Sequence, residues 1–323
     1  MNYNIKKDKS QDLILLKDKN RFGKVRPWKQ KKQDSLKLAY SYERLEYKKY
    51  YDSVLDCGSI LRFEVEVETG NRYLKNAWFC KKRLCPMCNW RRTKKIFSEV
   101  SRVMDVVQSE NLNLKALFLT LTQQNCDFDD LINGVDDVLK GWTSLTKHKI
   151  FERQIKGYFR ALEITYNEKT NSWHPHIHTI LLVEQDYFRK DNKEYVTTEK
   201  WSNLWKCAMK LDYNPIVDVR RAYNSKRKQV AEVAKYTSKS TDYLKKDLEK
   251  TDELVLMLTS ALHRRRLFMF GGVMKEVASR LGNEIPGEGD LIHVDGDSIR
   301  GDVAKLEEIY SWDFGIKNYV RVK

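Results

Sequence analysis

Two apolar stretches separated by only five residues constrain the fold more than any other feature of the sequence. Residues 157–167 (GYFRALEITYN) and 173–184 (WHPHIHTILLVE) have the composition of β-strands, and the polar segment EKTNS lies between them. A parallel crossover needs a dozen or more residues, so these strands can pair only as an antiparallel hairpin. The sheet that contains them is therefore at least partly antiparallel.

Strands and helices alternate along the rest of the chain. Because they surround an antiparallel pair, the predicted fold class is α+β. Further strands are expected at residues 60–67, 115–125 and 216–223, and helices at residues 34–55, 88–107, 130–146, 201–211, 230–246 and 247–282.

The charge balance indicates a polyanionic partner. The chain has 60 Lys and Arg against 45 Asp and Glu, a formal net charge of +15, and nucleic acid is the commonest polyanion. A solvated basic surface without a partner is the alternative. No apolar run reaches the roughly 18 residues of a membrane span and no signal peptide opens the chain, so we expect a cytoplasmic protein that does not bind membranes.

Four of the six cysteines are spaced as C-x22-C-x4-C-x2-C, which predicts a metal site. Two thiolates two residues apart, completed by an outer pair, suit one tetrahedral Zn²⁺ with no open position, so the ion would be structural. Unrelated reduced thiols and a redox C-x-x-C pair are the alternatives. The predicted zinc ligands are Cys57, Cys80, Cys85 and Cys88.

A basic helix is expected directly after the last of these cysteines. Such a helix, braced by zinc, would meet DNA phosphates well, although it is also compatible with a solvated helix face. The predicted DNA-binding residues are Arg91, Arg92, Lys94 and Lys95.

Three histidines begin the strand 173–184. Side chains alternate along a strand, so His174, His176 and His178 share one face, where three imidazoles make a poor core and a good metal site. If the hairpin turns in the middle of EKTN, Glu163 lies opposite His176 and is the candidate third ligand; a slip of one residue would place an apolar neighbour there instead. Hydrogen-bonded surface histidines are the alternative interpretation.

A glutamate and a tyrosine lie one turn apart on the predicted helix 230–246. Glu232 and Tyr236 are spaced i, i+4 and share a face, with Lys239 and Tyr243 further along it. A phenol with a pKa near 10 is a poor nucleophile, and a divalent ion that polarises a phosphate compensates for this. A tyrosine beside a metal site therefore favours attack on a phosphodiester. If this helix were considered alone, Tyr236 would be interpreted as a residue packed on the sheet.

Three motifs in order resemble those of HUH endonucleases. WHPHIHTILLV (173–183) resembles the His-hydrophobe-His motif, EVAKYTSK (232–239) looks like the catalytic-tyrosine motif of plasmid rolling-circle replication initiators, and FLTLTQQN (118–125) resembles their first strand motif. The best match is the Gram-positive plasmid branch, which carries a glutamate four residues before its tyrosine. The resemblance spans roughly residues 55–280, and the cysteine segment also has counterparts there.

The resemblance implies a ferredoxin-like HUH domain and a mechanism. His176 and His178 would hold Mg²⁺ or Mn²⁺, and Tyr236 would attack the scissile phosphate at the double-strand origin, leaving a 3′-hydroxyl and a 5′-phosphotyrosine. Glu232 would activate water for termination. Lys239 is placed to stabilise charge at the phosphate, Tyr243 competes with Tyr236 as nucleophile, and His174 would orient other groups without binding the ion.

The implied partners are plasmid origin DNA, bound as duplex and cut as single strand, and host replication proteins. A host helicase is among them because the sequence has no G-x-x-x-x-G-K-[ST] phosphate loop; a homo-oligomer is compatible with all of this. The alternatives are another HUH enzyme (transposase or relaxase), a non-catalytic zinc-dependent nucleic-acid-binding regulator, and a metallohydrolase of small substrates.

The expected organisation has four parts. They are a mobile basic arm (1–33), a helical region with a small four-cysteine zinc-binding segment that contacts DNA (34–110), an HUH nicking domain (111–246) and a helical C-terminal extension with a tail (247–323).

Overall fold

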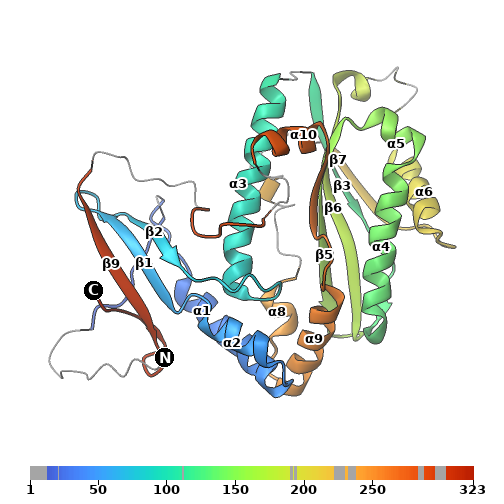
Figure 1. The fold of residues 1–323 in the computed structure, drawn as a ribbon. Helices are drawn as coiled ribbons and strands as arrows, with labels where there is room; N and C mark the ends of the chain where they lie inside the picture. The colour runs from blue at the N-terminus through green and yellow to red at the C-terminus, as the bar shows by residue number, and fades with distance from the viewer. Residues whose placement is uncertain are drawn as a thin grey trace.

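The computed structural model describes most of the residues of the chain. They are residues 13–20, 22–110, 113–189, 192, 195–221, 230–231, 238–282, 287–294 and 303–323. The predicted α+β class is confirmed, because two antiparallel sheets are flanked by helices (Figure 1). None of the helices described is long and apolar enough to span a bilayer.

The larger sheet has the predicted hairpin at its centre. The hairpin strands β5 (Gly157–Asn167) and β6 (Ser172–Glu184) pair antiparallel along their length. The sheet order is β7-β3-β6-β5-β8, with β4 also paired to β6. The remaining strands are β3 (Leu114–Leu121), β4 (Cys126–Asp127), β7 (Val217–Arg221) and β8 (Phe268–Gly272), and every pairing among them is antiparallel.

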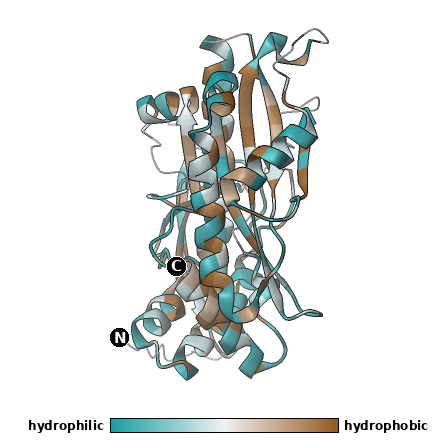
Figure 2. Cartoon of the chain, turned by 90° about the vertical axis from the view of Figure 1, so that its right-hand side faces the viewer, coloured by the Kyte–Doolittle hydropathy of each residue, from teal (hydrophilic) through white to brown (hydrophobic). Residues whose placement is uncertain are grey.

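Helices cover both faces of this sheet (Figure 1). One face packs on α4 (Leu131–Thr146), with α5 (Lys149–Gln154) and α6 (Thr198–Met209) beside it, and two short 3-10 turns, η1 (Phe128–Asp130) and η2 (Gln185–Phe188), lie at strand ends. The other side carries α3 (Pro86–Glu110) and α10 (Val273–Arg280). Apolar strands lie between helices of mixed polarity (Figure 2), so burial of the inward-facing side chains stabilises the sandwich.

The smaller sheet joins the two ends of the chain. Its order is β10-β9-β1-β2, formed by β10 (Asn318–Arg321), β9 (Lys305–Asp313), β1 (Ile60–Glu66) and β2 (Arg72–Ala77). The helices α1 (Trp28–Arg44), α2 (Lys48–Asp56), α8 (Ser240–Tyr243) and α9 (Leu248–Ala261) lie between the two sheets in Figure 1. The tail, which shows no clear pattern in the sequence, is thus an integral strand pair.

The described residues of the expected mobile arm (1–33), which are 13–20 and 22–33, are packed against the rest of the protein. Helix α1 begins at Trp28 rather than at residue 34, and the buried Asp18 accepts hydrogen bonds from Trp28 Nε1 at 2.6 Å and Arg26 at 2.8 Å. Leu15 also bridges to Val320. The many lysines of this segment suggest a solvated arm. The buried group of Asp18, Arg26 and Trp28 nevertheless holds the segment against the rest of the protein.

The helix predicted over residues 247–282 is wrong in its middle. Helix α9 ends at Ala261, and Phe268–Gly272 forms strand β8 on the edge of the larger sheet, paired with β5. Gly272 has a φ of +54° and its missing Cβ would lie 2.2 Å from the Lys156 carbonyl oxygen, which accounts for a glycine at this sharp turn into α10. Strand β8 pairs with β5, more than 100 residues earlier in the chain, and such a distant pairing has no signature in the local sequence.

Candidate metal centres

The hairpin brings one carboxylate and two imidazoles together. The predicted register is confirmed: Glu163 lies opposite His176, and the alternative slip is excluded because Leu162 pairs with Ile177. His178 Nε2 lies 2.8 Å and His176 Nε2 lies 3.5 Å from the same oxygen, Glu163 Oε2. The ligand atoms of these three residues all lie within 4.8 Å of one another, so the group can hold a metal ion.

Hydrogen bonds at the far side of each ring orient the two imidazoles. His176 Nδ1 lies 2.9 Å from the carbonyl oxygen of His174, and His178 Nδ1 lies 3.0 Å from Thr120 Oγ1. Without an ion, His178 Nε2–H donates to the Glu163 carboxylate at 2.8 Å; with the proton on Nδ1 instead, each ring would donate at that side and leave the Nε2 lone pair free for an ion. This is the arrangement by which outer partners fix the tautomer of metal-binding histidines.

The carboxylate is ionised despite its burial. Glu163 and His176 are each 8% exposed. Burial alone would raise the pKa of Glu163, but hydrogen bonds and charge from His176 and His178 outweigh it and hold that pKa well below its usual range. A buried anion facing two imidazole nitrogens has the chemistry of a cation site, and one carboxylate with two imidazoles fits a divalent ion.

His174 and Thr120 lie beside this group. His174 does not belong to the three-residue group; its ring centroid is 5.0 Å from that of His176, and its buried Nδ1 has no hydrogen-bond partner among the residues that the structure describes. Burial lowers the pKa of His174. Thr120 was missed as a site residue, although it lies in the FLTLTQQN motif, because only the pairing of β3 with β6 places it opposite His178.

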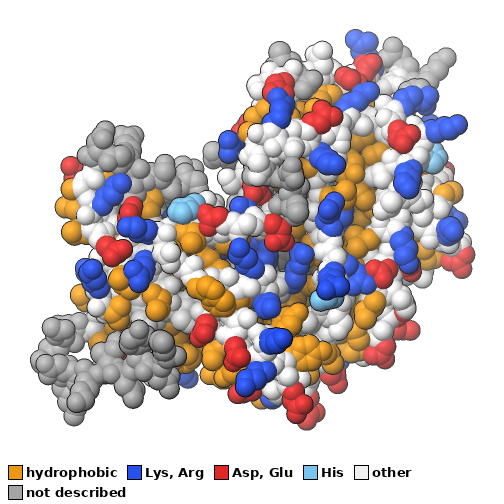
Figure 3. Space-filling model, viewed as in Figure 1, with side chains coloured by type: hydrophobic (Ala, Val, Ile, Leu, Met, Phe, Trp, Pro, Cys, Tyr) orange, Lys and Arg blue, Asp and Glu red, His pale blue; other side chains and the backbone are white. Residues whose placement is uncertain are grey.

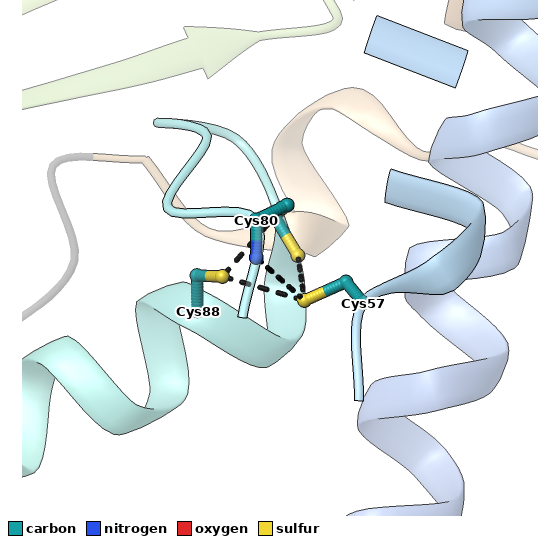
Figure 4. Close-up of side chains that lie close together, drawn as sticks. Cys57, Cys80 and Cys88 are labelled. Atoms are coloured by element: carbon teal, nitrogen blue, oxygen red, sulfur yellow. Dashed lines mark hydrogen bonds between the residues drawn. The ribbon is translucent and has the colours of Figure 1, made fainter. Parts of the chain in front are cut away.

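The four predicted cysteines form a second group. The Sγ atom of Cys88 lies 3.5 Å from that of Cys57 and 3.6 Å from that of Cys80 (Figure 4). Cys85 Sγ lies 3.6 Å from Cys57 Sγ. A disulfide would require about 2.05 Å, whereas four sulfurs around one tetrahedral ion at about 2.3 Å lie about 3.8 Å apart. The group therefore fits a single four-coordinate metal ion.

Burial explains why these thiols would need a cation. It raises the pKa of Cys57 and Cys88 well above the usual value. Burial acts on Cys85 in the same direction, but hydrogen bonds with the other three thiols outweigh it and lower that pKa. Burial therefore opposes the gathering of several thiolates in this small space, and holding all four as thiolates requires a positive ion.

Backbone and side-chain donors surround the sulfurs. Lys81 N–H donates to Cys88 Sγ at 3.2 Å, and Cys80 N–H donates to Cys57 Sγ at 3.4 Å. The buried Lys32 donates to the carbonyl oxygens of Leu55 at 2.6 Å and Cys57 at 2.9 Å. Burial lowers the pKa of Lys32 to about 8, so the Lys32 side chain is mostly protonated at neutral pH. Its positive charge favours thiolates nearby.

Two of the four basic residues predicted to bind DNA after Cys88 are buried in the protein. Arg91 is 0% exposed and its guanidinium donates to the carbonyl oxygens of Leu291 and Ile292, while Arg92 is 5% exposed and donates to Asn89 and Lys81. For Arg91 and Arg92 the prediction is wrong, because their guanidinium groups satisfy oxygen acceptors inside the protein. The other two are half-buried: Lys94 Nζ lies 5.0 Å from the Trp90 ring centroid, and Lys95 pairs with Glu99 at 3.4 Å.

The predicted nucleophile lies outside the described residues, as does its partner: Tyr236 and Glu232 both fall in the gap 232–237. Lys239 is exposed at the start of α8. Tyr243, the competing nucleophile, is fully buried and its hydroxyl donates to the Leu84 carbonyl oxygen, and burial raises its pKa well above 10. Tyr243 is therefore a packing residue that ties α8 to the segment between β2 and α3, residues 78–85, here called the cysteine loop.

Comparison with known proteins gives the family. The family model described as "Replication protein" matches residues 71–320. A "Protein rep" of Lactiplantibacillus plantarum is 36% identical over 315 residues, covering 94% of this chain and 98% of that one. Others from Bacillus amyloliquefaciens (35%, covering 96% and 98%) and Streptococcus pneumoniae (34%, covering 98% and 98%) are similar throughout. No solved structure matches. The chain belongs to the replication (Rep) protein family.

Proposed function

We propose that this Rep protein is a plasmid replication initiator that nicks and rejoins one DNA strand at the double-strand origin. The observation that carries the proposal is the group of Glu163, His176 and His178, with both Nε2 atoms directed at one carboxylate oxygen. The family membership supports the replication role. The net charge of +15 suits a DNA substrate.

The proposed cleavage is a transesterification by Tyr236. Its phenol oxygen attacks phosphorus and loses its proton, the bond from phosphorus to the 3′-oxygen breaks, and that oxygen leaves as a hydroxyl after taking a proton. A divalent ion, Mg²⁺ or Mn²⁺, held by Glu163, His176 and His178 would polarise the phosphate. Thr120 Oγ1, 3.0 Å from His178 Nδ1, is proposed to accept a hydrogen bond from that nitrogen and so leave Nε2 free for the ion, and Lys239 is proposed to stabilise negative charge at the phosphate.

The second group is proposed to hold a structural Zn²⁺. Its four sulfurs leave no open coordination position, which excludes water activation there. The cysteines connect the end of α2, the segment after β2 and the start of α3, and Tyr243 links the cysteine loop to the segment after Tyr236. We therefore propose that the zinc group supports the nicking unit, residues 111–246 together with β8, while duplex origin DNA and host replication proteins, a helicase among them, are its partners.

An SDS-stable adduct assay tests this function. Wild-type protein mixed with supercoiled plasmid and single-stranded origin oligonucleotides in Mn²⁺ is expected to give a covalent protein–DNA band, which EDTA prevents and Tyr236→Phe abolishes, since a benzyl side chain has no nucleophile. Origin binding by wild type without any adduct would instead favour a zinc-dependent regulator. An adduct that persists in Tyr236→Phe would reject Tyr236 as the nucleophile.

A separate effect is expected for termination. Glu232→Ala should nick at a rate within about threefold of wild type but fail to close the displaced strand, because no carboxylate remains to activate water at the regenerated origin. Multimeric single strands should accumulate in a replication assay, read on a denaturing gel. Glu232→Asp is the matched variant and should restore part of the termination. Monomeric products from Glu232→Ala would remove this residue from the mechanism.

A further inference from the structure

A small pocket lies where the cysteine loop meets the end of α9, and the nuclease chemistry does not use it. Its volume is about 160 Å³. Tyr42, Leu84 and Leu262, each 1% exposed, supply buried apolar lining. The rim is basic, and none of the described lining residues carries a carboxylate. The basic lining residues are Lys81, Lys82, Arg83, His263 and Arg264.

An aromatic ring lines the same pocket. Tyr50 packs on Tyr42 with ring centroids 5.0 Å apart, and Lys82 Nζ lies 4.3 Å from the Tyr50 centroid, so one ring face is already used to hold a cation. A cavity of about 150 Å³ accommodates a benzene ring. The pocket therefore has room for one aromatic ring beside Tyr50 and Leu262.

The cations on its rim are available to take an anion. Lys81, Lys82 and Arg264 form no ion pair with any residue of the described part of the chain, whereas Arg83 lies 3.6 Å from Glu288. Lys81 and Arg264 have φ values of +57° and +53°, a left-handed conformation that is uncommon away from glycine and often marks functional positions. Lys and Arg side chains are spread over the face of the molecule drawn in Figure 3, with Asp and Glu side chains between them.

We propose that this pocket binds one unpaired nucleotide of single-stranded DNA. The base enters beside Tyr50 above the apolar lining, and the flanking phosphates contact Lys81, Lys82 and Arg264. Lys82 moves from the Tyr50 face to a phosphate as the base takes its place, which its flexible stem permits. A base paired within a duplex cannot enter, so the pocket selects single strands. The inference rests on the proposed function only in taking the DNA strand as the ligand.

The test measures DNA binding by the full chain in buffer without Mg²⁺ or Mn²⁺, using a labelled 12-nucleotide oligo-dT and a duplex of equal length. Tyr50→Leu, which keeps apolar volume, should raise the Kd for oligo-dT about tenfold and leave duplex binding within about twofold. The double variant Lys82→Ser with Arg264→Asn should reduce the magnitude of the slope of log K against log salt concentration for oligo-dT by about 1.4. This corresponds to about 0.7 for each of two lost phosphate contacts. Lys200→Ser with Lys305→Asn removes the same charge from exposed sites elsewhere and should leave this slope unchanged.

Three results would overturn the pocket. The first is a folded Tyr50→Leu variant that binds oligo-dT with wild-type affinity. The second is an equal change in the salt dependence of oligo-dT binding in both double variants. The third is an equal loss of affinity for oligo-dT and for duplex in Tyr50→Leu. Because no cleavage is measured, the proposed nicking can fail independently. A chain that forms no adduct yet loses oligo-dT affinity in Tyr50→Leu would reject the nuclease and retain the pocket.

Discussion

Replacing His178 by Ala is expected to reduce strand cleavage by more than about 100-fold while duplex origin binding stays within about twofold of wild type. Loss of partners outside the ligand set already costs about 10–100-fold at metal sites, and His178 is proposed to bind the ion directly. His176→Ala should behave in the same way, because its Nε2 faces the same Glu163 oxygen. Nicking rates of a single-stranded origin oligonucleotide in Mn²⁺ and Mn²⁺ affinity by calorimetry measure the two effects.

His174→Ala is the matched control for this prediction. It lies on the same strand and face, but its side chain is outside the three-residue metal group. We therefore expect it to retain Mn²⁺ binding and to lose less than about tenfold in nicking rate. Equal losses in all three variants would indicate damage to the strand rather than to metal binding. Cleavage by folded His178→Ala at the wild-type rate would reject the proposed centre.

Disruption of the cysteine group should have the largest effect on stability. Cys85→Ser is expected to reduce bound zinc from one per chain to none and to unfold the region around α1, α2 and the start of α3. Structural zinc contributes about 10–16 kcal/mol of apparent binding free energy in small zinc domains, comparable with the roughly 5–15 kcal/mol that stabilises a typical domain. Zinc content by mass spectrometry and thermal unfolding by circular dichroism measure both changes.

Cys207→Ser provides the control. Cys207 is exposed on α6, away from the four-sulfur group, so this variant should keep one zinc per chain and the wild-type melting temperature. A chelator added to wild type should reproduce the Cys85→Ser phenotype. Stoichiometric zinc in purified Cys85→Ser, or none in wild type, would contradict the assignment.

The two metal groups differ in what fixes them. The Glu163, His176 and His178 group depends on one hairpin, in which strand alternation and a short turn set both face and register. The cysteine group joins three elements of the chain and is linked by Tyr243 to α8. We expect changes in the hairpin to act locally on chemistry and changes in the cysteine group to act on the fold.

Features that local rules control could be predicted from the amino-acid order alone. A five-residue connection and period-2 alternation predicted the hairpin, its register and the Glu163–His176 pairing, all of which are confirmed. The spacing of Cys57, Cys80, Cys85 and Cys88 predicted that four thiols meet, and their sulfurs do lie together. The hairpin and the segment from Cys80 to Cys88 are short stretches, where sequence distance limits distance in space, whereas Cys57 reaches the other three only through the fold.

Features that depend on distant partners became visible only once the chain was folded. Strands β8 and β9 form because they pair with the edges of β5 and β1, which lie far away in the sequence. Arg91 and Lys32 lie in basic stretches that are typical of a solvated surface. Both are nevertheless buried, because their side chains donate hydrogen bonds to backbone carbonyl oxygens inside the protein. A charged side chain is exposed or buried according to whether folding brings it enough hydrogen-bond acceptors to replace water, and those acceptors lie far away in the sequence.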